Sequence, residues 1–207
     1  MIKGGGGGLL SKDVKVSYKP KEYLKMNDDK VIELLEKISE WLQKRPSKGV
    51  RNNDREGVMI LRLLKRLSTE LHKVLPDDLK EHYRPQYSRG KSSLPRILWV
   101  SLCPKRRAVH NSMSVTICFS TSDNGFVFGI VDSVTMPQRW LPIVKREKGD
   151  ITVNVDAVNY KYNNAFHNPK EMELDSIDID VLRSHLVESS SILHQEILTR
   201  FPIIHVN

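Results

Sequence analysis

The sequence predicts an α+β fold with two N-terminal helices, a central, mainly antiparallel sheet and a C-terminal helix. Apolar residues recur at helical spacing between residues 31 and 74, and runs rich in β-forming residues fill the middle of the chain. A helical pattern returns after residue 178. Helices before and after a block of hairpin-connected strands are typical of α+β proteins.

Both N-terminal helices have recognisable start signals. Asn27 or Asp28 can cap the first helix, whose apolar stripe continues to about Lys44. Asp54 can cap the second helix, and Pro76 ends it. Two further helical segments are expected, a short turn at residues 77–83 and a long helix at residues 178–199.

The middle of the chain changes to short runs of β-forming residues. The run Ile97-Leu98-Trp99-Val100-Ser101-Leu102 is apolar and rich in such residues, and two more runs flank the turn Ser122-Asp123-Asn124-Gly125. Asn-Gly between such runs is a strong signal for a β-hairpin. The expected strands cover residues 97–102, 114–121 and 126–132, and two more are expected at 140–144 and 151–155.

We divide the chain into a flexible Gly/Lys-rich leader, residues 1–26, and a single α+β domain, residues 27–207. The domain has a helical part at 27–83, a sheet part at 94–156 and a C-terminal helix at 178–199. No signal-peptide pattern and no apolar run of transmembrane length are present, so we expect a cytoplasmic protein. Cys103 and Cys118 are then expected to be buried thiols rather than a disulfide.

The positive charge is concentrated in the first half of the chain. The net charge is +8, but residues 1–110 hold 25 Lys and Arg against 13 Asp and Glu, whereas residues 111–207 hold 8 against 12. Such an asymmetry indicates a polyanionic partner that is contacted mainly by the first half. The plainer alternative is a solvated basic surface with no specific partner.

Enzymatic motifs are weak. Gly90-Lys91-Ser92 resembles the end of a phosphate-binding loop, but Pro85 stands where that motif needs a glycine. The Asp-x-Lys matches lie in the leader or in helical context rather than on paired strands, and the seven histidines are scattered. We therefore expect a binding module with no catalytic centre, metal or cofactor. If it is an enzyme after all, the first carboxylates to test are Asp132, Asp150 and Asp156.

The strongest binding signal precedes the first expected strand. Arginines interleaved with tyrosines on a glycine-containing loop suit phosphate contact combined with stacking or insertion into a groove. The basic residues after the strand would extend that surface. The expected DNA contacts are Arg84, Tyr87, Arg89, Lys91, Arg96, Lys105 and Arg106.

The same region resembles the N-terminal domain of McrB, the recognition subunit of modification-dependent restriction systems. The resemblance lies in Gln86 to Pro95, in the tryptophan-bearing run 97–102, in the two following strands and in Gln138-Arg139-Trp140, and it spans about residues 77–165. It implies a module that binds duplex DNA, flips a modified cytosine out of the stack and encloses it in a pocket. By position, Trp99 is the first candidate for a pocket wall, and Phe119 and Phe128 are the second, since strand alternation can turn either of them toward the core instead. Tyr87 or Arg89 would insert into the duplex or contact a groove.

The sequence also departs from the McrB pattern. Three residues separate Pro95 from Trp99, whereas the family usually places its proline and tryptophan next to each other. The given sequence does not include the GTP-binding AAA+ module of McrB, so we expect either a recognition fragment of a larger protein or a stand-alone reader. The resemblance implies an AAA+ GTPase module and a nuclease subunit as candidate partners. Two other hypotheses stay open, namely an RNA-binding domain that stacks single-stranded bases on exposed aromatics and a protein-interaction module whose basic face binds an acidic partner.

Overall fold

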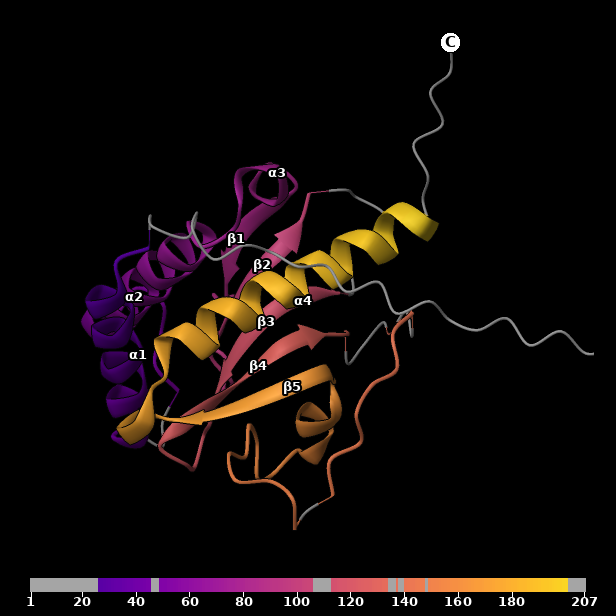
Figure 1. The fold of residues 1–207 in the computed structure, drawn as a ribbon. Helices are drawn as coiled ribbons and strands as arrows, with labels where there is room; N and C mark the ends of the chain where they lie inside the picture. The colour runs from indigo at the N-terminus through magenta and orange to yellow at the C-terminus, as the bar shows by residue number, and fades with distance from the viewer. Residues whose placement is uncertain are drawn as a thin grey trace, which may run out of the picture.

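A computed structural model describes residues 26–45, 49–105, 113–133, 137, 140–147 and 149–200 of the chain. Within this part, helices pack against one face of a five-stranded antiparallel sheet (Figure 1). The α+β class expected from the sequence is confirmed, with two helices before the sheet and a long helix after it. The expected leader lies almost entirely outside the described residues.

The two N-terminal helices begin where their cap signals lie. Helix α1 covers Asp28–Gln43, and the Asn27 side chain accepts a hydrogen bond of 3.0 Å from the Lys30 backbone N–H. Helix α2 covers Arg55–His72 and packs against α1. The short helix α3, Asp77–Lys80, follows as expected.

The sheet is a meander, since every strand pairs with its neighbours in the sequence, in the order β1-β2-β3-β4-β5. The hairpin expected at Asn124-Gly125 joins β3 to β4. The strands are β1 Tyr83–Tyr87, β2 Trp99–Pro104, β3 Ser114–Phe119, β4 Gly125–Val131 and β5 Phe166–Glu173.

The first strand, β1, was not expected from the sequence, which favoured a loop there. Its sequence, Tyr-Arg-Pro-Gln-Tyr, contains Pro85, which lacks a backbone N–H. A proline is tolerated in an edge strand, and β1 pairs only with β2. The sheet therefore begins at residue 83 rather than at 94.

The last strand, β5, was also missed, and the strands expected at 140–144 and 151–155 do not form. Residues 152–155 donate four successive backbone N–H groups to side-chain oxygens instead of to a neighbouring strand. Val153 and Val155 are nevertheless buried, which explains their strand-like alternation. The sheet accordingly extends to residue 173 rather than ending near 156.

A bulge in β4 lets the last strand come close. The pairing register between β4 and β5 shifts between Phe128 and Ile130, and the intervening Gly129 has a φ of +156°. A Cβ atom at Gly129 would lie 3.0 Å from the carbonyl oxygen of Asn168. A glycine at this position therefore permits the approach of β5.

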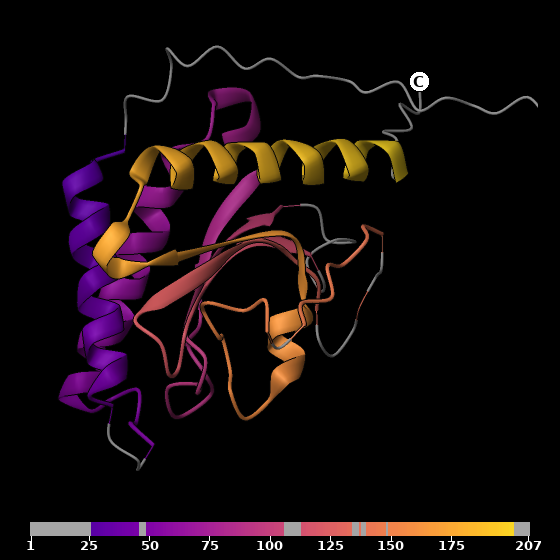
Figure 2. The same cartoon turned by 60° about the horizontal axis from the view of Figure 1, so that its bottom comes forward.

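The two faces of the sheet have different covers. Helix α4, Ile179–Arg200, crosses β3 and β4 on the same face as α2 (Figure 1). On the other face runs the connection from β4 to β5, which we call the covering segment, residues 140–147 and 149–165 (Figure 2). The main core lies on the helix side, and a smaller cluster around Val127, Val153 and Phe166 lies under the covering segment.

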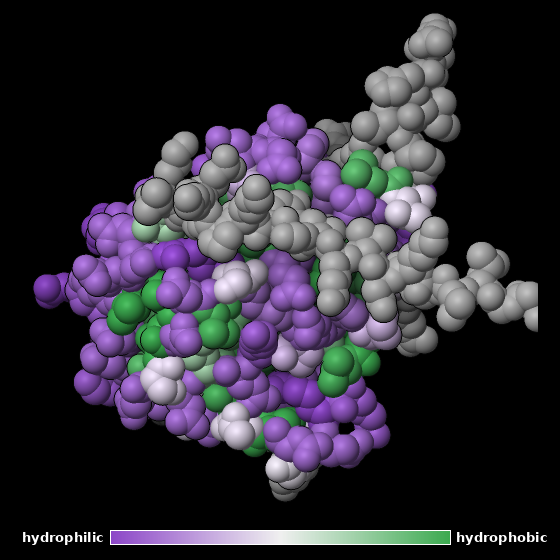
Figure 3. All heavy atoms as spheres, in the orientation of Figure 1, coloured by the Kyte–Doolittle hydropathy of each residue, from purple (hydrophilic) through white to green (hydrophobic). Residues whose placement is uncertain are grey.

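The outer surface on the α4 side is mostly hydrophilic, with apolar groups over the beginning of α4 (Figure 3). Leu174, Ile177, Ile179 and Val181 are partly buried there against the main core. Cys103 and Cys118 are both buried free thiols, as the sequence predicted.

Candidate functional site

A cavity of about 810 Å³ lies on the sheet face that carries the covering segment. Strand alternation creates its floor, because Ser101 and Cys103 of β2 face the cavity while Val100 and Leu102 face the helices. The covering segment supplies the opposite wall through Asp156, Val158, Asn159, Tyr162 and Ala165. This volume is within the usual range for small-ligand pockets, about 300–1,000 Å³.

The floor is polar but uncharged. The hydroxyls of Ser101 and Thr116 lie 2.7 Å apart, and those of Ser114 and Thr116 lie 2.8 Å apart, so three hydroxyls form one connected row. Thr116 is paired with Gly129, so no side chain of β4 stands beside the row at that point. Such a row can donate or accept hydrogen bonds toward a bound ligand.

The two thiols in the cavity are held in their neutral form. Burial raises the pKa of Cys103 to about 11, against smaller opposing effects of Arg84 and a hydrogen bond with Ser114. Burial raises the pKa of Cys118 to about 12. Both side chains therefore act as small apolar groups rather than as nucleophiles.

Aromatic side chains form the walls. Trp99, which the sequence analysis gave as a pocket-wall candidate, lines the cavity. The backbone N–H of Trp99 donates a hydrogen bond of 3.0 Å to the Ser88 hydroxyl. Tyr162 and Phe166 line the cavity as well. Flat apolar faces above a polar floor suit a flat heteroaromatic ring.

Phe119 and Phe128 do not line the cavity, so the prediction that they form its walls is wrong. Both are fully buried on the helix side of the sheet, and the ring of Phe128 packs edge-on against His185 of α4 at a centroid distance of 5.2 Å. Trp99 is paired with Cys118, and both line the cavity. Phe119 follows Cys118 in the strand, so the Phe119 side chain points to the face of the sheet away from the cavity.

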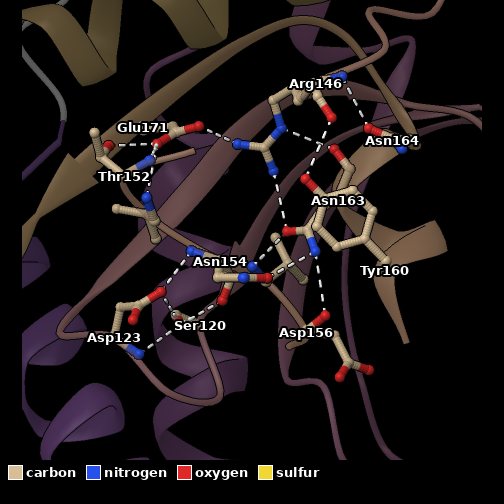
Figure 4. A network of polar contacts seen from close by, with 12 residues as sticks. Ser120, Asp123, Arg146, Thr152, Asn154, Asp156, Tyr160, Asn163, Asn164 and Glu171 are labelled. Atoms are coloured by element: carbon tan, nitrogen blue, oxygen red, sulfur yellow. Dashed lines mark hydrogen bonds and ion pairs between the residues drawn. The ribbon is translucent and has the colours of Figure 1, made fainter. Parts of the chain in front are cut away.

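The covering segment is held in place by a network centred on Arg146 (Figure 4). Its guanidinium donates to the carbonyl oxygen of Asn163 at 2.8 Å and to the Asn163 side-chain oxygen at 3.2 Å, and it forms an ion pair with Glu171 of β5. The Arg146 side chain is only 6% exposed. The side-chain oxygen of Asn163 also accepts a hydrogen bond of 2.7 Å from the Val155 backbone N–H, so the network connects distant parts of the segment.

Glu171 anchors the same segment to the sheet. Burial raises the pKa of this carboxyl, but hydrogen bonds from Thr152 and Val153 and the charge of Arg146 outweigh that effect, so the net pKa lies below its ordinary value. The backbone N–H groups of Thr152 and Val153 donate to one carboxylate oxygen at 2.9 and 2.7 Å. The charged form of Glu171 is thus part of the folded structure.

Asp156 connects the covering segment to the entrance of β2. Its side chain is fully buried and forms an ion pair with Arg96, whose side chain is 47% exposed. The other carboxylate oxygen accepts from the backbone N–H groups of Val158 at 2.9 Å and Asn159 at 3.0 Å. Asp156 therefore fixes a turn beside the cavity and holds Arg96 against it.

The expected DNA-contacting residues fall into separate groups. Arg84 and Arg96 are on the cavity side: Arg96 lines the cavity, and Arg84 alternates with the buried Tyr83 of the core. The Gln86 amide oxygen, turned toward Arg84, accepts two hydrogen bonds from the Arg84 guanidinium, at 3.1 and 3.2 Å. Gln86 also lines the cavity.

Tyr87 and Arg89 belong to the other side. Tyr87 packs against the main core, and the Arg89 guanidinium lies 4.7 Å from the centroid of its ring. Lys91 and Lys105 are exposed in the loops before and after β2, and Arg106 lies outside the described residues. The structure therefore does not bring the six described residues of this set together into one surface.

A further arginine, Arg45, positions the loop that leads into β2. Its guanidinium donates to the carbonyl oxygens of Leu94 at 3.0 Å, Pro95 at 2.9 Å and Arg96 at 2.9 Å, and it lies 5.4 Å from the centroid of the Trp41 ring. Arg45 therefore clamps this loop rather than presenting its charge to solvent.

The three carboxylates considered for catalysis have different surroundings. Asp132 lines the cavity and is 3% exposed, and its Oδ1 accepts from the Ser133 backbone N–H at 2.7 Å. Asp156 lines the cavity but both of its oxygens are engaged, as described above, and Asp150 lies in an exposed turn. Asp132 and Asp156 therefore belong to the cavity lining, and Asp150 does not.

Several cavity residues were not expected from the sequence. Ser101, Ser114 and Thr116 alternate with apolar residues in β2 and β3, and this alternation was a usable signal for a polar face. Tyr162 and Phe166 gave no such signal, because their position depends on the path of the covering segment.

Comparison of the chain with protein-family models, curated proteins and solved structures found no match. The resemblance to the McrB N-terminal domain therefore stays a prediction. In the described part of the chain, no three His, Cys, Asp or Glu side chains group as a metal site. Among the same residues, no helix has the length and apolar character needed to cross a membrane.

Proposed function

We propose that the chain is a DNA-recognition module that reads a modified cytosine in duplex DNA by enclosing the flipped base in the cavity described above. The cavity itself carries the proposal: the partly exposed aromatic side chains of Trp99 and Tyr162 line it around a polar floor, with the buried Phe166 behind them. A flipped base needs such stacking surfaces together with hydrogen-bonding groups for its edge. The cavity-side arginines, Arg84 and Arg96, supply cations for the phosphates nearby.

The polar groups of the cavity fit the chemistry of cytosine. The exocyclic amine of cytosine is a hydrogen-bond donor, and the hydroxyl row of Ser101, Ser114 and Thr116 offers acceptor oxygens for it. Cys103 and Cys118 are neutral and apolar at physiological pH and do not compete as charged groups. We propose as partners an AAA+ GTPase module and a nuclease subunit, in line with the McrB resemblance.

Fluorescence anisotropy tests the proposal with matched duplexes, unmodified and carrying 5-methylcytosine, at about 50 and 200 mM salt. A protein that neutralises roughly six phosphates loses on the order of a thousandfold in affinity across that range. We expect the modified duplex to bind at least about tenfold more tightly at both salt concentrations, a preference of about 1.4 kcal/mol.

Two variants localise the preference. Trp99→Ala removes a cavity wall and should abolish the preference for the modified duplex, whereas Met59→Ala, at an exposed position of α2 outside the cavity, should retain it. Equal affinity of the unchanged protein for both duplexes would refute the reading of cytosine modification and leave only a salt-dependent basic surface.

The outer face of α2 favours a second candidate function, the binding of an acidic, amphipathic helix of a partner protein. A shallow hollow there is lined by the exposed cations Arg55, Arg62, Lys65 and Arg66 and by apolar Met59 and Leu63. Glu70, at its end, already forms ion pairs with Lys30 and Lys73. The double variant Arg62→Glu/Arg66→Glu distinguishes the two functions, because it should leave modification-dependent DNA binding intact if the cavity is the reading site.

A further inference from the structure

Val158 is the most solvent-exposed large apolar side chain of the described residues. It is 83% exposed, whereas Met59 and Val144, the next two, are each 44% exposed. Val158 also lines the cavity, so this apolar group stands at the entrance rather than at an arbitrary place on the surface. An isolated exposed apolar residue is ordinary, but one on the rim of a binding cavity requires a physical reason.

The backbone that carries Val158 is fixed rather than free. The fully buried Asp156 carboxylate accepts hydrogen bonds from the backbone N–H groups of Val158 and Asn159, at 2.9 and 3.0 Å. The Asp156 carbonyl oxygen accepts from the Asn163 side chain at 3.2 Å, which ties the turn to the Arg146 network. A β-branched side chain on such a turn is itself restricted in rotation.

Arg96 is next to this turn through its ion pair with Asp156, and its side chain is about half exposed. The rim therefore combines a rigid apolar tip with a guanidinium that can reach a phosphate. Proteins that distort a duplex combine the same two elements, an apolar wedge between bases and cations on the flanking backbone.

From this juxtaposition we infer that Val158 is the wedge that enters the base stack and occupies the space left by the flipped base. The inference rests on the proposed function, and it replaces Tyr87 and Arg89 as inserting groups, because Tyr87 packs on the opposite side of the sheet. The wedge acts only when a stacked duplex has to be opened. A single strand has no opposing base pair to replace.

The full chain carrying Val158→Ala tests the inference on two probes that contain the same 5-methylcytosine, a duplex and a single strand. Losing two methyl groups from a buried contact weakens binding on the order of tenfold. We expect this loss on the duplex and less than about a twofold change on the single strand. Val144→Ala is the matched control, because it truncates another exposed valine that does not line the cavity.

A second measurement follows the opening of the base pair itself. 2-Aminopurine next to the target cytosine should brighten when the unchanged protein binds, and should brighten less with Val158→Ala at saturating protein. If Val158→Ala binds the modified duplex as tightly as the unchanged protein does, with equal brightening, the wedge is refuted and the proposed function stands. Equal losses on duplex and single strand would likewise refute it, since Val158 would then be a simple contact. If the unchanged protein does not prefer the modified duplex, the proposed function fails and the wedge with it.

Discussion

Replacement of Arg146 by methionine removes the central cation of the network beneath the sheet while keeping most of the side-chain volume. The variant leaves Glu171 without its ion pair and the Asn163 carbonyl oxygen without its donor. Breaking a buried ion pair by removing one partner costs about 3–5 kcal/mol. Glu171 keeps its hydrogen bonds from Thr152 and Val153 and is 18% exposed, so the lower end of that range applies.

We therefore expect Arg146→Met to lower the free energy of unfolding by about 3 kcal/mol. The midpoint of thermal unfolding should fall by roughly 6–12 °C for a domain of this size. Urea unfolding followed by circular dichroism measures the free energy, and hydrogen exchange should show faster exchange at the backbone N–H groups of residues 152–155.

Lys145→Met is the matched control, because it removes the neighbouring cation in the same way. Lys145 is 78% exposed, and its ion pair with Glu147 is on the surface, so its loss should cost less than about 1 kcal/mol. A double-mutant cycle compares the unchanged protein, Arg146→Met, Glu171→Gln and the double variant. It should assign most of the loss in unfolding free energy to the Arg146–Glu171 pair. A cost for Arg146→Met within about 1 kcal/mol of the control would refute the anchoring role of the network.

Three further predictions concern acid stability, backbone geometry and thiol reactivity. The lowered pKa of Glu171 contributes stability that is present above the unfolded pKa of about 4.3 and is lost as the pH falls through the folded value. The unchanged protein should therefore be more stable than Glu171→Gln at neutral pH, and this difference in unfolding free energy should shrink in acid. A difference that grows as the pH falls below about 4 would contradict the lowered pKa. Gly90→Ala should destabilise the protein by about 1–3 kcal/mol in thermal melts. Gly90 has a φ of +67°, and a Cβ atom there would lie 1.9 Å from the Ser93 carbonyl oxygen. The control Gly49→Ala should be nearly neutral, because a Cβ atom at Gly49 meets no atom within 4 Å. Cys103 and Cys118, with pKa values of about 11 and 12, should resist iodoacetamide at pH 8 and react on addition of denaturant, and fast labelling of the folded protein would contradict their burial.

Local signals were sufficient for the helices and the central hairpin. Asn27 caps α1 through its own side chain, and Asn124-Gly125 joins β3 to β4, so each of these features depends on residues close together in the sequence. The strand-like run at 151–155 was misinterpreted because its hydrogen-bond acceptors, Asp123, Asn163 and Glu171, lie elsewhere in the chain. A local sequence pattern cannot predict hydrogen-bond acceptors that lie far away in the chain.

The candidate site was predictable in part. Trp99 lines the cavity, whereas Phe119, which the sequence analysis grouped with it, projects from the opposite face of the sheet. A shift of one residue in strand register reverses the face of every side chain, and the register became known only from the pairing of Trp99 with Cys118. Tyr162 and Phe166 require the path of the covering segment, which no periodicity in the sequence specifies.

The order of the strands has a consequence for how the cavity is assembled during folding. Strands β1 to β4 pair through short connections, whereas β5 joins only after the chain from residue 132 to residue 165 has closed a long loop. Contacts of large sequence separation form at a higher entropic cost, so the hydroxyl floor on β2 and β3 should form before the wall above it. Substitutions in the wall, such as Arg146→Met, should then accelerate unfolding and leave the refolding rate nearly unchanged.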